Sequence, residues 1–145
     1  MRIAQLTAHI VQLNLRKEFK HASYSRRCSE NLIVECQLED GTVGWGEGVP
    51  REYVTGETAL GALDQLDATD LPEQLHADCE NWEDVIQLCE GYRPSVGASD
   101  PRGCLANAQR CAVELSILDA YGRLFATPLR EVTRRYAPAE KINQE

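Results

Sequence analysis

The fold is decided by residues 42–58, which read Thr-Val-Gly-Trp-Gly-Glu-Gly-Val-Pro-Arg-Glu-Tyr-Val-Thr-Gly-Glu-Thr. Glycine occupies every second position from Gly44 to Gly48, so one face of an extended strand here carries no side chains. Such a bare face is typical of a strand against which another backbone packs closely. After a polar loop, the pattern changes to that of a helix capped by Thr55 or Thr58, with Glu57 suited to the dipole of its first turn.

Two further strands are predicted upstream of this stretch. Apolar residues alternate with polar ones from Leu32 to Leu38, which indicates a strand with one buried face. Asp40-Gly41 predicts a two-residue hairpin, so this strand and the glycine-bearing strand should pair antiparallel. Residues 3–15 form another strand pattern whose parity changes midway, and we expect a bulge or a bend near Ile10.

Helical patterns follow the strands, and each is marked by its caps and by an apolar stripe. Asn81 caps the second helix, Asp100-Pro101 opens the longest, and Thr127-Pro128 precedes a short last helix that ends at about Tyr136. The stripes are Ala59, Leu60, Leu63 and Leu66; Trp82, Val85, Ile86 and Cys89; and Leu105, Ala108, Ala112, Leu115, Leu118, Tyr121 and Phe125. The sequence thus predicts an α+β fold, a three-stranded antiparallel meander followed by a bundle of about four helices.

Composition limits the class of protein. The 145 residues suit one folded domain, and 43% hydrophobic with 26% charged residues is ordinary globular usage. The net charge of −8 argues against nucleic acid and membrane as partners. No long apolar run or signal peptide is visible, so we expect a cytoplasmic protein. The six cysteines, without a zinc-site spacing, should be reduced and mostly buried.

No catalytic constellation is visible in the sequence. The pair Gly44-Trp45-Gly46 lacks the rest of a nucleotide fingerprint, and Glu47 is best interpreted as a structural carboxylate with backbone donors or a basic partner. Two irregular segments, residues 16–29 and 49–55, leave neighbouring positions of the sheet, and they are either ordinary solvent loops or a ligand-contacting surface. Their aromatic and polar residues are Phe19, His21, Tyr24, Arg26, Arg51, Tyr53 and Thr55.

Taken together, several motifs resemble the N-terminal capping domain of the enolase superfamily, in particular the muconate lactonizing enzymes and dipeptide epimerases. The motifs are the loop around Phe19, Asn31-Leu32-Ile33-Val34, Asp40-Gly41, Gly44-Trp45-Gly46-Glu47, Tyr53-Val54-Thr55-Gly56-Glu57-Thr58, the helix at residues 112–123 and its exit Thr127-Pro128-Leu129. The sequence departs from the family at residues 130–135, Arg-Glu-Val-Thr-Arg-Arg, where Leu-Leu-Gly-Gly is common.

The resemblance implies a domain that folds over an α/β barrel, where magnesium and barrel lysines act on a carbon next to a carboxylate. None of those positions lies in this sequence, so we expect no catalytic residue, metal or cofactor in it, and magnesium only in the intact enzyme. Residues 1–136 would be the capping domain, and residues 137–145 a polar tail or the start of a linker to a barrel that this sequence does not contain. The chain would then be an excised or truncated part of the enzyme.

The resemblance also implies that two loops close over the barrel mouth and contact the distal part of a small carboxylate substrate. The matching surroundings carry this role over to Phe19, Tyr53, Val54 and Thr55, and position in the loop alone carries it to Lys20, His21, Ser23 and Arg26. The intact enzyme would be an isomerase, a dipeptide epimerase or a muconate cycloisomerase, and a homo-oligomer is left open. The alternative is a freestanding α+β module that binds a protein or a ligand.

Overall fold

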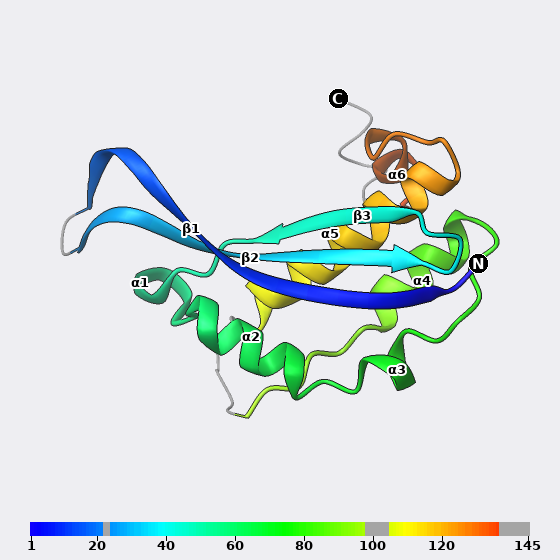
Figure 1. The fold of residues 1–145 in the computed structure, drawn as a ribbon, viewed down its shortest axis with the longest axis horizontal. Helices are drawn as coiled ribbons and strands as arrows, with labels where there is room; N and C mark the ends of the chain where they lie inside the picture. Colours follow the sequence, from blue (N-terminus) through cyan, green and yellow to red (C-terminus); the bar gives the residue numbers. More distant parts are fainter. Residues whose placement is uncertain (22–23, 98–104, 137–145) are drawn as a thin grey trace.

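The computed structural model of the chain describes residues 1–21, 24–97 and 105–136, and it has two layers (Figure 1). A three-stranded antiparallel sheet in the order β1-β2-β3 is followed by helices, which confirms the predicted α+β class. The elements are β1 (Ile3–His21), β2 (Tyr24–Leu38), β3 (Val43–Gly48), α1 (Glu52–Thr55), α2 (Ala59–Asp67), α3 (Leu71–Gln74), α4 (Trp82–Gly91), α5 (Asn107–Leu124) and α6 (Arg130–Arg135).

The glycine face of β3 packs on the backbone of α5, as the sequence predicts for a bare strand face. A Cβ atom added at Gly44, Gly46 or Gly48 would lie within 2.0–2.1 Å of a backbone atom of α5. The opposite face carries Trp45, whose side chain is 47% exposed. Asp119 of α5 accepts a hydrogen bond from the backbone N–H of Trp45 at 2.9 Å, so α5 also covers part of the outer edge of β3.

The apolar face of β2 forms the centre of the core. Leu32, Val34, Cys36 and Leu38 are all buried, as their alternation predicts. The turn that follows has three residues, 39–41, rather than the predicted two. Gly41 has a φ of +86° and donates to the carbonyl of Leu38 at 2.9 Å, which is the geometry of a type I turn closed by a left-handed glycine.

Residues 16–21 and 24–29 form the outer part of the long antiparallel pair β1–β2, so the prediction of an irregular loop is wrong for them. The two strands β1 and β2 extend well beyond β3 as a two-stranded ribbon, which we call the arm (residues 16–21 and 24–30; Figure 1). The ladder continues through Phe19↔Arg26 and Lys20↔Ser25. Both faces of the arm meet solvent, so polar residues occupy both and no alternation is left to mark the strands.

The predicted bulge near Ile10 is also wrong. Ile10 pairs with Leu32 in a continuous register, and the irregularities lie between Ile3 and Gln5 and between Asn14 and Phe19. None of residues 3–20 is fully buried, because β1 is an edge strand. Because no position of this edge strand must be apolar, the alternation of apolar and polar residues can shift by one position midway while the backbone continues without a bulge.

The helical stripes are confirmed in part. In α4, Asn81 forms a capping box with Asp84, and Trp82, Val85 and Cys89 are buried. In α2, Thr58 is the N-cap, but Leu60 is 62% exposed and Ala62 is buried instead. The one-turn helices α1 and α3 were not predicted.

The buried face of α5 consists mainly of small and polar residues; it shares Ala108, Ala112 and Tyr121 with the predicted stripe and differs at the other positions. Leu115 and Leu118 are only partly buried. The fully buried positions are Ala108, Gln109, Ala112, Val113, Ser116, Ile117, Ala120 and Tyr121. Close approach to the glycines of β3 selects small side chains on this face, so hydrophobicity does not mark it. The predicted start at Asp100-Pro101 lies outside the described residues, as do Cys104 and residues 137–145.

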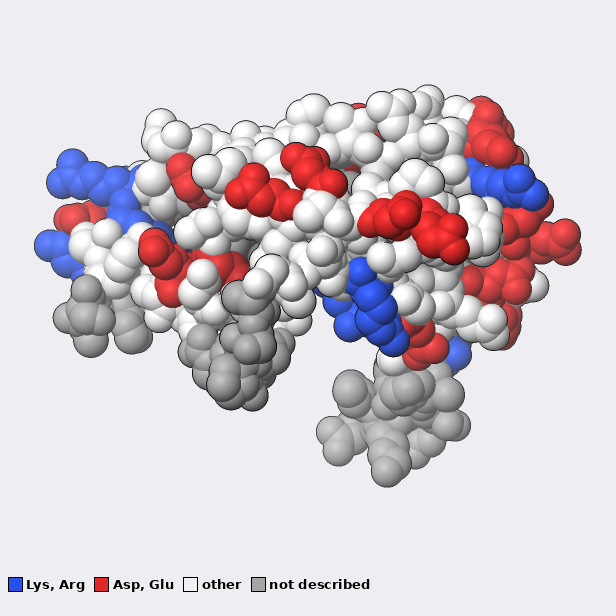
Figure 2. Space-filling view, turned by 90° about the horizontal axis from the view of Figure 1, so that it is seen from below, with Lys and Arg blue, Asp and Glu red and all other residues white. Residues whose placement is uncertain are grey.

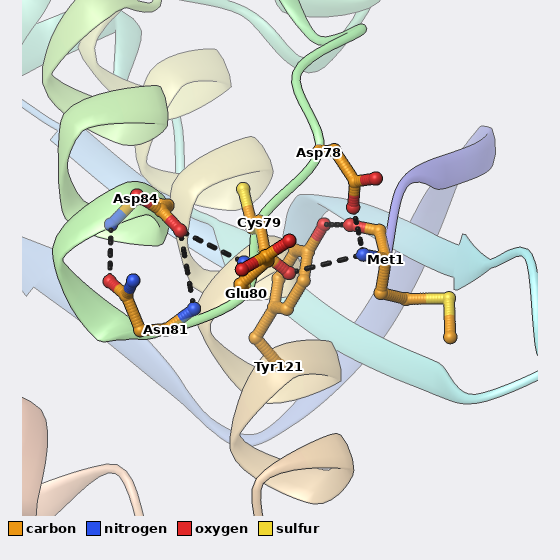
Figure 3. A network of polar contacts seen from close by, with 7 residues as sticks. All are labelled: Met1, Asp78, Cys79, Glu80, Asn81, Asp84 and Tyr121. Carbon is orange, nitrogen blue, oxygen red and sulfur yellow. Dashed lines mark hydrogen bonds and ion pairs between the residues drawn. The ribbon is translucent and has the colours of Figure 1, made fainter.

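Met1 ties β1 to the helical layer through a polar network (Figure 3). Its amino group pairs with the carboxylate of Asp78 and donates to the carbonyl of Cys79 at 3.2 Å. The hydroxyl of Tyr121, from α5, donates to the carbonyl of Met1 at 2.8 Å. The same connector then leads into the capping box at the start of α4, so Met1, just before β1, meets the start of α4 and Tyr121 of α5 at one point.

Cysteine burial predicts a loss of stability in alkali. Cys28, Cys36, Cys79, Cys89 and Cys111 are free thiols, and burial raises the pKa of Cys36 and of Cys89 from 9.0 to about 12. Unfolded chains would release these protons near pH 9 while the folded chain keeps them until about pH 12. Stability should therefore be fully present below pH 9 and decline as the pH rises towards 12. Urea unfolding at pH 7, 9, 10 and 11 tests this prediction. The Cys36→Ala variant should show a smaller decline of stability with pH. Unchanged stability of the parent chain across the series would contradict the prediction.

Candidate functional site

An open cleft of about 370 Å³ lies between the arm and the segment that leads from β3 into α2. It joins the two segments singled out from the sequence, although one of them is a ribbon and not a loop. The lining residues are Tyr24, Ser25, Arg26, Arg27, Cys28, Ser29, Glu30, Pro50, Arg51, Glu52, Tyr53, Glu57, Thr58 and Ala59. The volume falls in the range of small-molecule sites.

An aromatic stack forms part of the lining of the cleft. The rings of Tyr24, from β2, and Tyr53, from α1, are stacked with centroids 4.3 Å apart and planes 20° from parallel. Both side chains remain partly exposed. The stack is a contact between the arm and α1, so the two expected halves of the lid touch directly.

The pleat of the arm places the predicted lid residues from the segment 16–29 on two opposite faces. The guanidinium of Arg26 lies over the ring of Phe19 at 5.3 Å, on the face that carries Tyr24. Lys20 belongs to the other face, where its ammonium is 3.4 Å from the carboxylate of Glu18. His21 ends β1 opposite Tyr24, and Ser23 lies outside the described residues.

A chain of hydrogen bonds holds Arg51, one of the lining residues of the cleft, in place. Its Nη2 donates to the hydroxyl of Ser29 at 3.1 Å, and that hydroxyl donates to Oδ1 of Asn31 at 2.5 Å. Nδ2 of Asn31 donates to Oε1 of Glu47 at 2.5 Å. Glu47 is therefore a structural carboxylate, as predicted, but its partner is an amide side chain. Burial and the nearby charge of Arg26 lower the pKa of Arg51.

Thr55 and Val54 differ in what they can contact. The hydroxyl of Thr55 donates to Oε2 of Glu57 at 2.8 Å and points into the protein, whereas Val54 is 57% exposed. Glu57 is buried, and its Oε1 accepts a hydrogen bond from the backbone N–H of Ala108 at 3.0 Å. Glu57 thus serves the first turn of α5 and not, as predicted, the first turn of α2.

Tyr24 and Arg51 line the cleft and belong to the surface singled out from the sequence, but the lid role implied by the resemblance was not carried over to them. A strand pattern through residues 24–28 would have placed Tyr24 and Arg26 on one face, but the polar composition hid that pattern. Nothing local marks Glu57 as a partner of α5, because its contact spans 51 positions of the sequence.

Loss of the aromatic stack should loosen the arm. Tyr53→Ala removes the ring that packs on Tyr24, a contact worth about 0.5–1.5 kcal/mol beyond its buried area. Amide hydrogen exchange of residues 24–28 should become faster, while exchange in α5 stays as in the parent chain. Val54→Ala, one position away, is the matched control and should change neither. Unaltered exchange of the arm in Tyr53→Ala would show that the stack does not hold it.

Neither a metal site nor a membrane-spanning helix is found in the described parts of the chain. No cluster of three His, Cys, Asp or Glu side chains in residues 1–21, 24–97 and 105–136 could hold a metal ion. Within the same residues, no helix is both long and apolar enough to cross a bilayer. The cleft offers guanidinium, aromatic and hydroxyl groups, which suit binding and orientation of a ligand.

Comparison with known proteins gives one consistent result. No protein-family model matches the chain. The chain is 30% identical over 130 residues to an aromatic dipeptide epimerase from Herpetosiphon aurantiacus, covering 88% of this chain and 33% of that protein. It is 34% identical over 136 residues to a hydrophobic dipeptide epimerase from Enterococcus faecalis, covering 94% and 35%.

Solved structures show the same relation. The dipeptide epimerase from Enterococcus faecalis in complex with Mg and the dipeptide L-Leu-L-Tyr superposes with a TM-score of 0.71 at 25% identity, over 92% of this chain and 34% of that one. The chain spans about one third of the length of the relatives it matches. The alignment falls on their N-terminal part.

Proposed function

The chain has the sequence and the fold of the N-terminal capping domain of dipeptide epimerases and related enolase-superfamily enzymes, and we propose that it acts as their substrate-capping and specificity domain. In this role, residues 1–136 cover the mouth of a barrel domain, and the cleft between the arm and α1 contacts the distal part of a small carboxylate substrate. The intact enzyme is proposed to be an isomerase that epimerises dipeptides.

The observation that carries this proposal is the contact between the two lid segments. Tyr24 and Tyr53 stack on each other in the lining of the cleft, and Arg26 and Arg51 also line it. These segments are separated in the sequence, yet together they line one cleft that is large enough for a small molecule. Phe19 supports the site indirectly, through its contact with Arg26.

The proposal assigns binding and no chemical step to the described residues. The Enterococcus faecalis enzyme was solved in complex with Mg, whereas the described residues of this chain include no cluster of side chains that could bind a metal ion. In the intact enzyme, the metal and the proton-transferring groups would come from the barrel. The role of this domain is to orient the substrate and to exclude water from it.

A chimera tests the proposal. Residues 1–136 replace the aligned N-terminal third of the Enterococcus faecalis epimerase, and the product is assayed against a panel of dipeptides. We expect epimerase activity with a changed order of preference, and a second change of preference when the chimera carries Tyr53→Ala. A folded chimera with the preference of the parent enzyme would refute the role in specificity. Turnover of L-Ala-L-Glu by this chain alone with magnesium would refute the assignment of all chemistry to the barrel.

A further inference from the structure

The two edges of the sheet differ in how they are protected. At the short edge strand β3, the backbone N–H of Trp45 donates to the carboxylate of Asp119 at 2.9 Å, and the carbonyl of Glu47 accepts a hydrogen bond from the thiol of Cys111 at 3.6 Å. Both partners come from α5, which therefore shields this edge. A sheet edge that is covered in this way is a poor template for a further strand.

The edge formed by β1 lacks such protection. Within the described residues, the backbone of residues 3–14 bonds only to β2, so the N–H and C=O groups on its other side have no partner there. Residues 3–15 contain no Asp, Glu, Lys, Arg, Pro or Gly, although 26% of the chain is charged. Charged side chains and proline are the usual means of blocking an exposed edge. The edge of β1 is therefore open to another strand.

Irregularities at both ends limit the open edge to one regular stretch. The pairing of β1 with β2 is continuous from Gln5 to Asn14, and its register shifts between Ile3 and Gln5 and again between Asn14 and Phe19. Such irregularities bend a strand and interrupt its ladder. A strand that pairs with β1 would therefore align with residues 5–14.

Apolar surface lies along the same edge. The side chains of Ile10 and Leu13 are 40% and 49% exposed. An open groove of about 430 Å³ is lined by residues 3–6 of β1 and by Leu71 and Leu75 of the α3 segment, among others. Because consecutive residues of a strand line it, this groove opens at the edge of the sheet and not on one face. A strand added here would bury apolar surface as well as free backbone groups.

The distribution of charge favours an antiparallel partner of the same kind. The arm, which continues β1 beyond Asn14, holds five basic and two acidic residues, a net charge of +3 in a chain of −8. At the other end of β1, the segment 78–84 beside Met1 has four acidic residues and no basic one. Figure 2 shows basic side chains at the end where the arm projects and mainly acidic ones at the opposite end. Two antiparallel copies would place the basic end of each against the acidic end of the other.

We propose that β1 is a self-association surface, along which a second copy of this chain pairs antiparallel through residues 5–14 and joins two three-stranded sheets into one of six strands. A two-fold axis near His9 and Ile10 relates the copies, so each copy uses the same edge. Assembly stops at the dimer, because the remaining edges of the joined sheet are the β3 strands, which α5 covers. The inference does not rest on the proposed function and adds a surface for assembly to it.

Sedimentation equilibrium of this chain over a range of concentrations tests the proposal. We expect a monomer–dimer equilibrium with a dissociation constant on the order of 10 μM, since a single strand pair forms a small interface. Amide hydrogen exchange locates the contact. Where about nine-tenths of the chain is dimeric, the amides of residues 5–14 that do not bond to β2 should exchange about tenfold more slowly than in dilute solution. Residues 43–48 of β3 should exchange at the same rate in both.

Like charges on the edge should weaken the dimer. Gln12→Lys or His9→Lys places two added lysines in one short ladder, and each should raise the dissociation constant about tenfold. Gln87→Lys makes the same change on the exposed surface of α4, and this matched control should dimerise as the parent chain does. The measurements on the parent chain stand even if a variant does not fold.

Three results would overturn the proposal. The first is a parent chain that stays monomeric at about 1 mM, far above the expected dissociation constant. The second is an open-ended aggregate in place of a dimer. The third is a dimer that the edge variants weaken no more than Gln87→Lys does. The chimera assay is independent of all three, because it measures substrate preference and not assembly.

Discussion

Gly46→Ala is expected to remove most of the stability of the domain. A Cβ atom at this position would lie 2.0 Å from the carbonyl oxygen of Ala112 and 2.5 Å from the amide nitrogen of Ser116. Neither backbone atom can rotate away, so α5 would have to move off the sheet by about 1 Å or more. That movement would open the core around Val113 and Ile117, which are fully buried.

We expect a loss of about 3 kcal/mol or more in the free energy of unfolding, measured by urea denaturation followed by circular dichroism. Domains of this size have about 5–15 kcal/mol in total, so an unfolded variant is within the expected range. Gly91→Ala is the matched control, because a Cβ at the end of α4 meets nothing within 4 Å. It should change stability by less than about 1 kcal/mol. A Gly46→Ala domain as stable as Gly91→Ala would mean that α5 does not lie against this face.

The sheet could be predicted wherever one face of a strand is buried and the other is not. Leu32, Val34, Cys36 and Leu38 face the core, and their alternation is visible because the demand for apolar side chains is one-sided. The strands of the arm could not be predicted in this way, because a ribbon with solvent on both faces needs no apolar residues at alternate positions. The glycine face of β3 was predictable in kind, but not its partner, since small residues on α5 carry no hydrophobic signal.

The sequence predicts which two segments form the candidate site, but it does not predict which of their side chains meet there. Two polar stretches with aromatic residues indicate a contact surface, and they do converge. Which residues meet depends on the register of the arm, where Phe19 pairs with Arg26 and Lys20 turns to the opposite face. A register is a property of two strands, so it cannot be read from one segment alone.

The site also depends on a residue whose role is set by a distant element. Glu57 lies between α1 and α2 and is only 6% exposed. The N-cap position of α5 is Ala106, which has no side-chain oxygen to offer to the first turn. The carboxylate of Glu57 takes over this task from a different part of the chain, and the negative charge suits the positive end of the helix. It therefore joins the floor of the cleft to the helix that supports the sheet.

Glu57→Ala should cost about 2–4 kcal/mol in the free energy of unfolding, because it removes a charged hydrogen bond and leaves the N–H of Ala108 buried without an acceptor. Glu57→Gln keeps an oxygen for that N–H and loses only the charge, so we expect about 1 kcal/mol. Glu52→Gln, an exposed carboxylate on the rim of the same cleft, is the control and should be nearly neutral. Urea denaturation gives the ranking Ala, Gln, control, and hydrogen exchange at the start of α5 should follow it. If Glu57→Ala were as mild as Glu52→Gln, the carboxylate of Glu57 would not be what anchors the start of α5.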